Sequence, residues 1–380
     1  RKPVIVVGGG YNGDDNGDDR CEGDAATILA KLGKDAANRC AAGDPNRYGQ
    51  DDTRGNALYV ADAATGALVW RALPGTEGYD ADAKAYRHPE LKDSVPSDVT
   101  AADMDGNGTL DRIYFGDTGG KVWRADLFGN NPANWKVSLL FNAGRHFNSA
   151  ANNDLRFFNR PDLVKSQDIN GAFDAVLIGS GDREAPLERS AQNRFFMIKD
   201  RAVRSGSPST TTLTPTNLQN LTSLACLTAA DSCRQNPDSN LNRNGWYIDL
   251  AGSGNPLYAG GEKNLAPAIT SSGTIFFTTF VPTERTGNQT GACALSEGSG
   301  YVYAVNLQDS SPVFNYNLAN DAPETPTLER SDLLGGGGIP VEVVPVGDRF
   351  VLVQGQEVGQ NIQRVGGRDR WRTYWYEVDE

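Results

Sequence analysis

Side chains that carry oxygen recur at alternate positions in residues 103–111, and this spacing is typical of a loop that binds a hard cation. Asp103, Asp105 and Asp111 stand at the first, third and ninth positions, Asn107 stands at the fifth, and Thr109 at the seventh offers its backbone carbonyl. Calcium takes about six to eight oxygen ligands, and calcium loops place them at alternate positions, with glycine where the chain turns. The segment therefore predicts a Ca²⁺ site formed by these five residues. The alternative is a solvated acidic turn between two strands.

The segment departs from an EF-hand in two ways. No glutamate stands at the twelfth position, and the run RIYF (residues 112–115), typical of a strand, follows where an EF-hand has a helix. We therefore expect an EF-hand-like loop on a β scaffold, with Asp111 as the closing ligand.

Three other segments resemble binding motifs more weakly. Residues 168–174 repeat the Asp-x-Asn-Gly pattern before a strand, but the loop is shorter and has fewer carboxylates, so we interpret it as a turn. Residues 12–19 are acidic, and such runs are usually solvated. Residues 8–13 match G-x-G-x-x-G, but the aspartates that follow would repel a pyrophosphate, which favours a tight glycine turn at a strand end.

The sequence gives no positive sign of an active site. Its two histidines, His88 and His146, belong to no H-E-x-x-H motif, and no G-x-S-x-G segment is present. Both histidines are expected to have surface or structural roles. Hydrolysis by a pair of carboxylates remains an alternative, because any acidic protein offers candidate pairs.

Composition narrows the class of partner. The chain has 380 residues and a formal net charge of −12, which repels phosphate backbones and anionic membrane surfaces. No apolar stretch is long enough to span a bilayer. We therefore expect no nucleic-acid partner and no membrane insertion.

The five cysteines form no C-x-x-C pair, so neither a zinc ribbon nor a thioredoxin-like motif is supported. Disulfides between Cys21 and Cys40 and between Cys226 and Cys233 would close local loops, which leaves Cys293 free or bonded outside this chain. The odd count and the start without Met or an apolar signal region suggest an excised extracytoplasmic fragment.

The elements that must position the loop are short strands. Apolar runs bounded by Gly, Asp, Asn or Ser occur at residues 4–7, 57–60, 112–115, 175–178, 274–277, 301–304 and 350–353. Helical spacing is convincing only in short pieces such as residues 24–34. The pattern predicts an all-β chain with short helices.

A repeat indicates propeller blades. Residues 57–71 and 112–124 both read strand, Asp, Thr-Gly turn, strand and Val-Trp-Arg, and residues 301–315 form a weaker third copy. Units of about 40–50 residues built in this way predict roughly seven blades over this length. We expect one modified β-propeller domain over residues 1–380, with insertions at about 12–55 and 205–244. Those insertions are either exposed loops or partner-binding surfaces.

Several segments resemble the C-terminal propeller of PilY-type proteins of type IV pilus biogenesis, which include tip adhesins. They are VVGGGYN (6–12), GNALYVADAATGALVW (55–70), the calcium loop joined to GDTGGKVWRADL (116–127), GWYIDL (245–250) and GEKNLAPAITSSGTIFFTTFVPT (261–283). The similarity runs in order over most of the chain.

The resemblance implies a modified seven-bladed propeller at the end of a longer exported protein, displayed at the pilus tip or on the cell surface. It implies that calcium in the matching loop regulates pilus extension against retraction, twitching motility and adhesion. Implied partners are pilin and minor pilins, together with a host or surface ligand. The domain is not expected to be an enzyme.

Two other readings remain open. The Thr-Gly and Val-Trp-Arg repeats are also similar to those of quinoprotein dehydrogenases that bind pyrroloquinoline quinone, but the chain lacks their adjacent cysteine pair. A propeller scaffold for envelope assembly, which needs no calcium loop, is the third reading.

Overall fold

The computed structural model describes residues 2–12, 52, 54–144, 155–187, 189, 191–204, 211–224, 226, 231–250, 261–282, 298–316, 328–346, 349–352 and 357–358. Within these ranges the chain is nearly all β. Helix is limited to α3 (Ser232–Gln235), α4 (Asn240–Arg243) and the 3-10 turns η2 (Pro132–Asn134) and η4 (Pro215–Asn217). The expected all-β fold is confirmed, and the helix expected at residues 24–34 lies outside the described residues.

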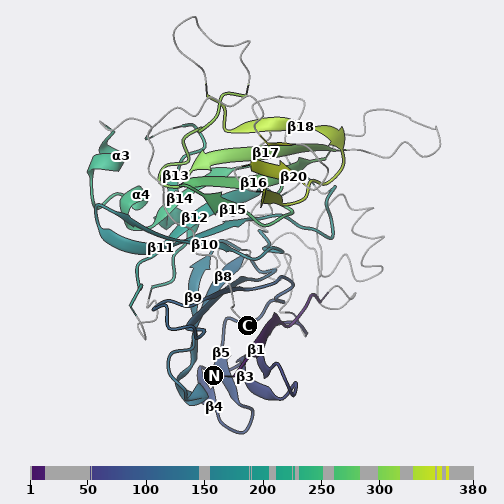
Figure 1. Ribbon diagram of the computed structural model, residues 1–380, viewed down its shortest axis with the longest axis vertical. Helices are drawn as coiled ribbons and strands as arrows, with labels where there is room; N and C mark the ends of the chain where they lie inside the picture. The colour runs from purple at the N-terminus through teal and green to yellow at the C-terminus, as the bar shows by residue number, and fades with distance from the viewer. Residues whose placement is uncertain are drawn as a thin grey trace, which may run out of the picture.

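The described strands form five sheets that follow one another in chain order (Figure 1). The first, ordered β1-β2-β3-β5-β4, contains β1 (Val4–Gly8), β2 (Leu58–Asp62), β3 (Leu68–Pro74), β4 (Gly78–Asp80) and β5 (Ala85–His88). The second, ordered β6-β7-β8-β9, contains β6 (Thr100–Ala102), β7 (Arg112–Gly116), β8 (Lys121–Asp126) and β9 (Lys136–Asn142).

The third sheet, ordered β10-β11-β12-β14-β13, contains β10 (Asp162–Asp168), β11 (Gly171–Gly179), β12 (Arg194–Asp200), β13 (Gln219–Asn220) and β14 (Gly245–Asp249). The fourth, ordered β15-β16-β17-β18, contains β15 (Ile269–Ser271), β16 (Thr274–Val281), β17 (Ser299–Asn306) and β18 (Ser331–Gly337). The fifth contains β19 (Val343–Val346), β20 (Arg349–Leu352) and β21 (Glu357–Val358). All seven predicted strand runs correspond to strands of these sheets, although residue 57 precedes β2 and residue 353 falls outside the described part.

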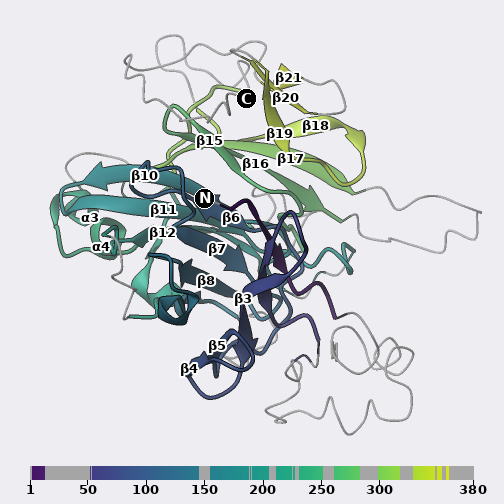
Figure 2. The same cartoon turned by 60° about the horizontal axis from the view of Figure 1, so that its bottom comes forward.

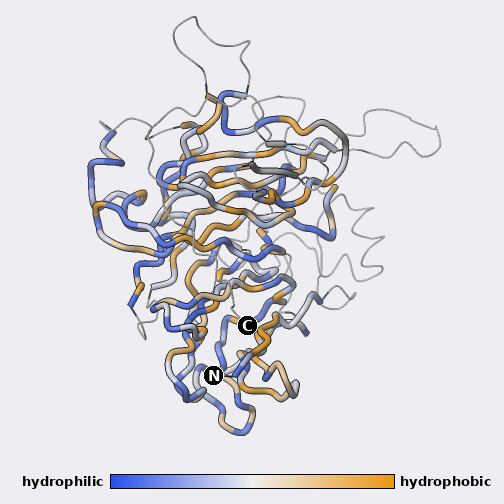
Figure 3. Tube along the Cα trace, in the orientation of Figure 1, coloured by the Kyte–Doolittle hydropathy of each residue, from blue (hydrophilic) through white to orange (hydrophobic). Residues whose placement is uncertain are grey.

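Buried apolar side chains hold the successive sheets face to face, and Figure 2 shows the same succession from a second direction. Each of four clusters contains residues from two neighbouring sheets, for example Trp70 and Trp123, Tyr114 and Phe196, Phe195 and Phe277, or Phe276 and Val343. Burying an aromatic side chain contributes about 1.5–3 kcal/mol relative to leaving it exposed. In agreement with this packing, apolar residues concentrate in the strands and hydrophilic residues in the connections (Figure 3). This arrangement of small, mostly antiparallel sheets around successive cores is that of propeller blades.

Ring stacking adds to the junction between the third and fourth sheets. Phe277 lies between Phe195, at 3.9 Å between ring centroids, and Tyr303, at 4.6 Å. Aromatic pairs contribute about 0.5–1.5 kcal/mol beyond their buried area. These two successive sheets are thus held by specific ring contacts as well as by burial.

The second expected insertion contributes to the propeller itself. Strand β13 pairs in parallel with β14 at the edge of the third sheet, and α3 and α4 precede β14. The interpretation as exposed loops alone is therefore incomplete. Most of the first expected insertion lies outside the described residues. In the described part of the chain, no helix is both long and apolar enough to cross a membrane.

Candidate metal centre

The predicted calcium loop connects two antiparallel strands of the second sheet. Ala102, at the end of β6, pairs with Arg112, at the start of β7, and the amide of Asp111 donates to the Ala102 carbonyl at 3.0 Å. Gly106 and Gly108 have φ angles of 76° and 75°, in the left-handed region that glycine adopts without strain. The strands therefore fix both ends of the loop, and the glycines allow it to curl back on itself.

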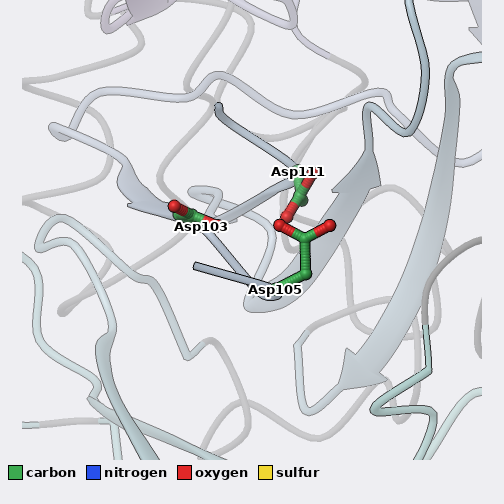
Figure 4. A group of neighbouring side chains, drawn as sticks. All are labelled: Asp103, Asp105 and Asp111. Carbon is green, nitrogen blue, oxygen red and sulfur yellow. The ribbon is translucent and has the colours of Figure 1, made fainter. Parts of the chain in front are cut away.

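The three aspartates of the loop lie together (Figure 4). One carboxylate oxygen from each of Asp103, Asp105 and Asp111 lies within 4.8 Å of the others, and the carboxyl groups of Asp105 and Asp111 face each other. Asp105 is exposed, whereas Asp111 is 4% exposed. The predicted carboxylate ligands are therefore close enough to share one cation.

Backbone amides organise the first aspartate. Asp103 accepts hydrogen bonds from Gly108 at 2.6 Å, Gly106 at 2.7 Å and Asn107 at 3.2 Å. Burial raises the pKa of Asp103, but these three amide donors outweigh burial and lower it overall. Asp103, the first residue of the loop, is therefore held in its ionised form.

The closing aspartate has the opposite electrostatic environment. Burial raises the pKa of Asp111, and the negative charges of Asp105 and Asp103 raise it further, against the hydrogen bond from the Met104 amide at 2.8 Å. A carboxylate in this setting is costly to ionise unless a positive charge lies beside it. A divalent cation would supply that charge, and carboxylate oxygens are the ligands that calcium prefers.

Asn107 is less ready to act as a ligand than the three aspartates. Oδ1 of Asn107 accepts a hydrogen bond from the Thr109 amide at 2.8 Å and another from the Thr109 hydroxyl. An amide oxygen has two lone pairs, and both are engaged. Coordination through Asn107 therefore requires one of these bonds to break. The chemistry of the donor set fits calcium, with a small rearrangement at this position.

The structure also reveals contacts to the loop from the third sheet. Nζ of Lys165, on β10, donates to the carbonyls of Met104 at 3.0 Å and Asp103 at 3.4 Å. The guanidinium of Arg112 donates to Asp174, on β11, at 2.7 Å and to Asp126 at 3.2 Å. The sequence gives one signal for the Arg112 contact, because a charged residue opens the apolar strand run 112–115. It gives no signal for the Lys165 contact.

The second Asp-x-Asn-Gly segment has no free charge for an ion. Oδ2 of Asp168 accepts from Nζ of Lys199 at 2.6 Å and from Arg201 at 2.7 Å. Burial raises the pKa of Asp168, but the hydrogen bonds from Arg201 and Lys199 lower it overall. The interpretation of this segment as a structural turn agrees with these ion pairs.

The glycine-rich segment after β1 contains close backbone contacts. A Cβ atom on Gly9 would lie 2.2 Å from the Gly55 carbonyl oxygen, and the Gly10 amide donates to the Val95 carbonyl at 3.0 Å. His88 packs edge-on against Trp123 at 4.9 Å and accepts a hydrogen bond from the Glu90 amide. Both features have the structural roles that the sequence indicates, and His146 lies outside the described residues.

The cysteines are described only in part. Cys226 and Cys233 lie at disulfide distance, with their sulfurs 1.99 Å apart, which agrees with the predicted pairing. Cys21, Cys40 and Cys293 lie outside the described residues, so the other pairing stays a prediction.

The fold and this loop define a class: a β-propeller-like domain with an acidic loop between the first two strands of a blade. No family model matches the chain. The chain is 24% identical over 312 residues to the type IV pilus biogenesis factor PilY1 homolog of Xylella fastidiosa, a match that includes 78% of this chain and 20% of that protein. This chain thus spans about a fifth of the length of that relative.

A solved structure has the same fold. The C-terminal domain of Pseudomonas aeruginosa PilY1 superposes with a TM-score of 0.55 and 17% sequence identity, over 81% of this chain and 66% of that one. Together the two matches confirm the expected resemblance to PilY-type proteins: the chain is similar in sequence to a PilY1 homolog and has the propeller-like fold of a PilY1 C-terminal domain. The count of about seven blades stays a prediction, since the described residues form five sheets.

Proposed function

We propose that this chain is the calcium-binding, non-enzymatic C-terminal domain of a type IV pilus biogenesis factor. The relationship to a protein named as such a factor supports the biological role. The gathering of three carboxylates in one loop, where burial and like charge oppose the ionisation of Asp111, supports the cation. We propose that Asp103, Asp105, Asn107, Thr109 and Asp111 provide the oxygen ligands for Ca²⁺.

The physical effect of the ion follows from the charges. Without a cation, the three carboxylates repel one another across at most 4.8 Å. At that separation each pair of charges repels by roughly 1–3 kcal/mol near a protein surface. A bound Ca²⁺ reverses this term and fixes the start of β7. The ion would then shift the second sheet between two states, and in the full-length protein this shift would regulate pilus extension against retraction.

We place the full-length protein at the cell surface, at or near the pilus tip, in contact with pilin and minor pilins. In that place it would support twitching motility and adhesion to a host or other surface. The similarity to the PilY1 homolog is the basis for this proposal. The proposal concerns the full-length protein, because this chain spans only a fifth of that relative.

Calorimetric titration with Ca²⁺ tests the site. Asp105→Asn removes one charge from an exposed position without a buried contact, and we expect it to weaken binding about tenfold or more. Asp98→Asn is the matched control, because Asp98 is also an exposed aspartate near the start of β6. Equal affinities in the two variants, or no binding by the unaltered chain, would refute the assignment.

A second experiment tests the biological role. Cells that carry Asp105→Asn in the full-length protein should show reduced twitching at a calcium concentration that supports normal motility, and cells that carry Asp98→Asn should move normally. Normal twitching in both strains, together with lost binding in vitro, would show that the site has no role in the pilus.

A further inference from the structure

One pair of opposed residues on the third sheet holds both ends of the acidic loop. Lys165 and Asp174 face each other in the register of the β10–β11 hairpin. Lys165 donates to the carbonyls of the first two loop residues, Asp103 and Met104. Asp174 accepts from Arg112, the residue that follows the last loop position, at 2.7 Å. A change in the loop therefore reaches this residue pair of the hairpin through both contacts, one at Lys165 and one between Arg112 and Asp174.

The two contacts differ in rigidity. Arg112 is fully buried and also contacts Asp126 and the Ala202 carbonyl, so its position is fixed by several partners. Lys165 is an exposed lysine with a flexible stem. The buried pair therefore sets the geometry of the junction, and Lys165 is the contact that can respond when the loop changes shape.

The turn of the same hairpin contacts the insertion before β14. At the β10–β11 turn, Nδ2 of Asn170 donates to the Pro237 carbonyl at 2.7 Å. Asp168, at the end of β10, pairs with Arg201, whose Nε donates to the Arg243 carbonyl at 2.9 Å. The hairpin thus contains seven residue pairs, with the acidic loop near the middle pair and the segment of α3 and α4 at the turn.

We propose that the β10–β11 hairpin transmits the state of the loop at residues 103–111 to the surface formed by residues 231–244, with Lys165 as the adjustable contact. This rests on the proposed calcium function, because Ca²⁺ is the ligand that would change the loop. A cation that draws the loop together moves the carbonyls held by Lys165 and tightens the start of β7. The surface that the cation would order is therefore the segment of α3 and α4, beside the third sheet. A partner could contact this segment without contacting the ion.

Backbone hydrogen exchange with and without Ca²⁺ measures this coupling directly, because local opening sets the exchange rate. In the unaltered chain we expect saturating Ca²⁺ to slow exchange in the loop and, about fivefold or more, in residues 231–244. Lys165→Met keeps the length of the side chain and removes the donor. In this variant, brought to saturation by its own titration, we expect slowing in the loop and less than half of the response in residues 231–244.

Lys84→Met is the matched control, since Lys84, in the turn between β4 and β5, also donates to a backbone carbonyl of a neighbouring strand, that of Leu68 in the first sheet. It should respond to Ca²⁺ as the unaltered chain does. If exchange in the loop itself ignores Ca²⁺, the proposed calcium function fails. If the loop responds while residues 231–244 do not, or if Lys165→Met responds as fully as the control, the coupling is refuted and the calcium function stands.

Discussion

The indole nitrogen of Trp123 donates a hydrogen bond to Oδ2 of Asp117 at 2.7 Å, whereas the indole nitrogen of Trp70, in the matching position of the first repeat, is buried and has no hydrogen-bond partner among the described residues. The turn of the first repeat is longer, and its aspartate, Asp62, accepts instead from the amides of Ala64 and Thr65. Two copies of one sequence motif thus have different hydrogen bonding.

Trp123→Phe should therefore cost more stability than Trp70→Phe. Both changes remove a similar volume, but only Trp123→Phe removes a donor from a buried carboxylate, a loss of about 1.5–3 kcal/mol. Chemical denaturation of the two variants measures the difference. Equal losses of stability in the two variants would mean that the hydrogen bond to Asp117 makes no net contribution to the free energy of unfolding.

The same pair has a pH dependence. Burial raises the pKa of Asp117 to about 7, against the charge of Lys121 and the bond from Trp123. A raised pKa in the folded state means that the stability linked to this group is fully present below 3.8 and is lost as the pH rises through about 7. The penalty of Trp123→Phe should therefore be larger at pH 8 than at pH 6, because the ionised carboxylate depends more on its donor. A penalty that does not change with pH would contradict this assignment.

The strands and the three aspartates could be predicted because their signals are local. Alternation, turn residues and the spacing of Asp103, Asp105 and Asp111 lie within single short segments. The contacts of Lys165 and Asp174 could not be predicted, because they depend on the packing of two sheets. The difference between Trp70 and Trp123 depends on the longer turn of the first repeat, in which Asp62 accepts from the amides of Ala64 and Thr65 and not from the indole. The role of β13 was missed because a two-residue strand has no pattern of its own.

Calcium should raise the melting temperature of the purified chain. A ligand that binds only the folded state stabilises it by about 2.7 kcal/mol at a free concentration one hundred times its Kd. Scanning calorimetry with added Ca²⁺, and again after removal by a chelator, measures this effect. Mg²⁺ should give a smaller shift, because it holds its waters and demands octahedral geometry. A Tm that ignores Ca²⁺ at every concentration would argue for a solvated acidic turn.

The buried pair of Lys121 and Asp93, 2.8 Å apart and both fully buried, should couple strongly in a double-mutant cycle. Lys121→Met alone removes the cation beside two buried carboxylates, Asp93 and Asp117, and should cost about 3–5 kcal/mol. Adding Asp93→Leu removes one of these two negative charges, and the double variant should recover at least half of the loss. Denaturation of the three variants gives the coupling energy, and simple addition of the two single losses would rule it out.

Asp168 should stabilise the fold far more than Asp238 does, although both carboxylates pair with arginine. Asp168 also holds Lys199, whose side chain is 1% exposed, whereas Asp238 and Arg243 are 72% and 60% exposed. We expect Asp168→Asn to cost about 2–4 kcal/mol and Asp238→Asn less than about 1 kcal/mol at pH 7. Because the pKa of Asp168 is lowered in the folded state, its contribution is present above 3.8 and is lost as the pH falls through the folded-state value. The gap between the two variants should therefore shrink in acid, and a gap that stays constant down to the acid transition would show that packing, not charge, sets the loss.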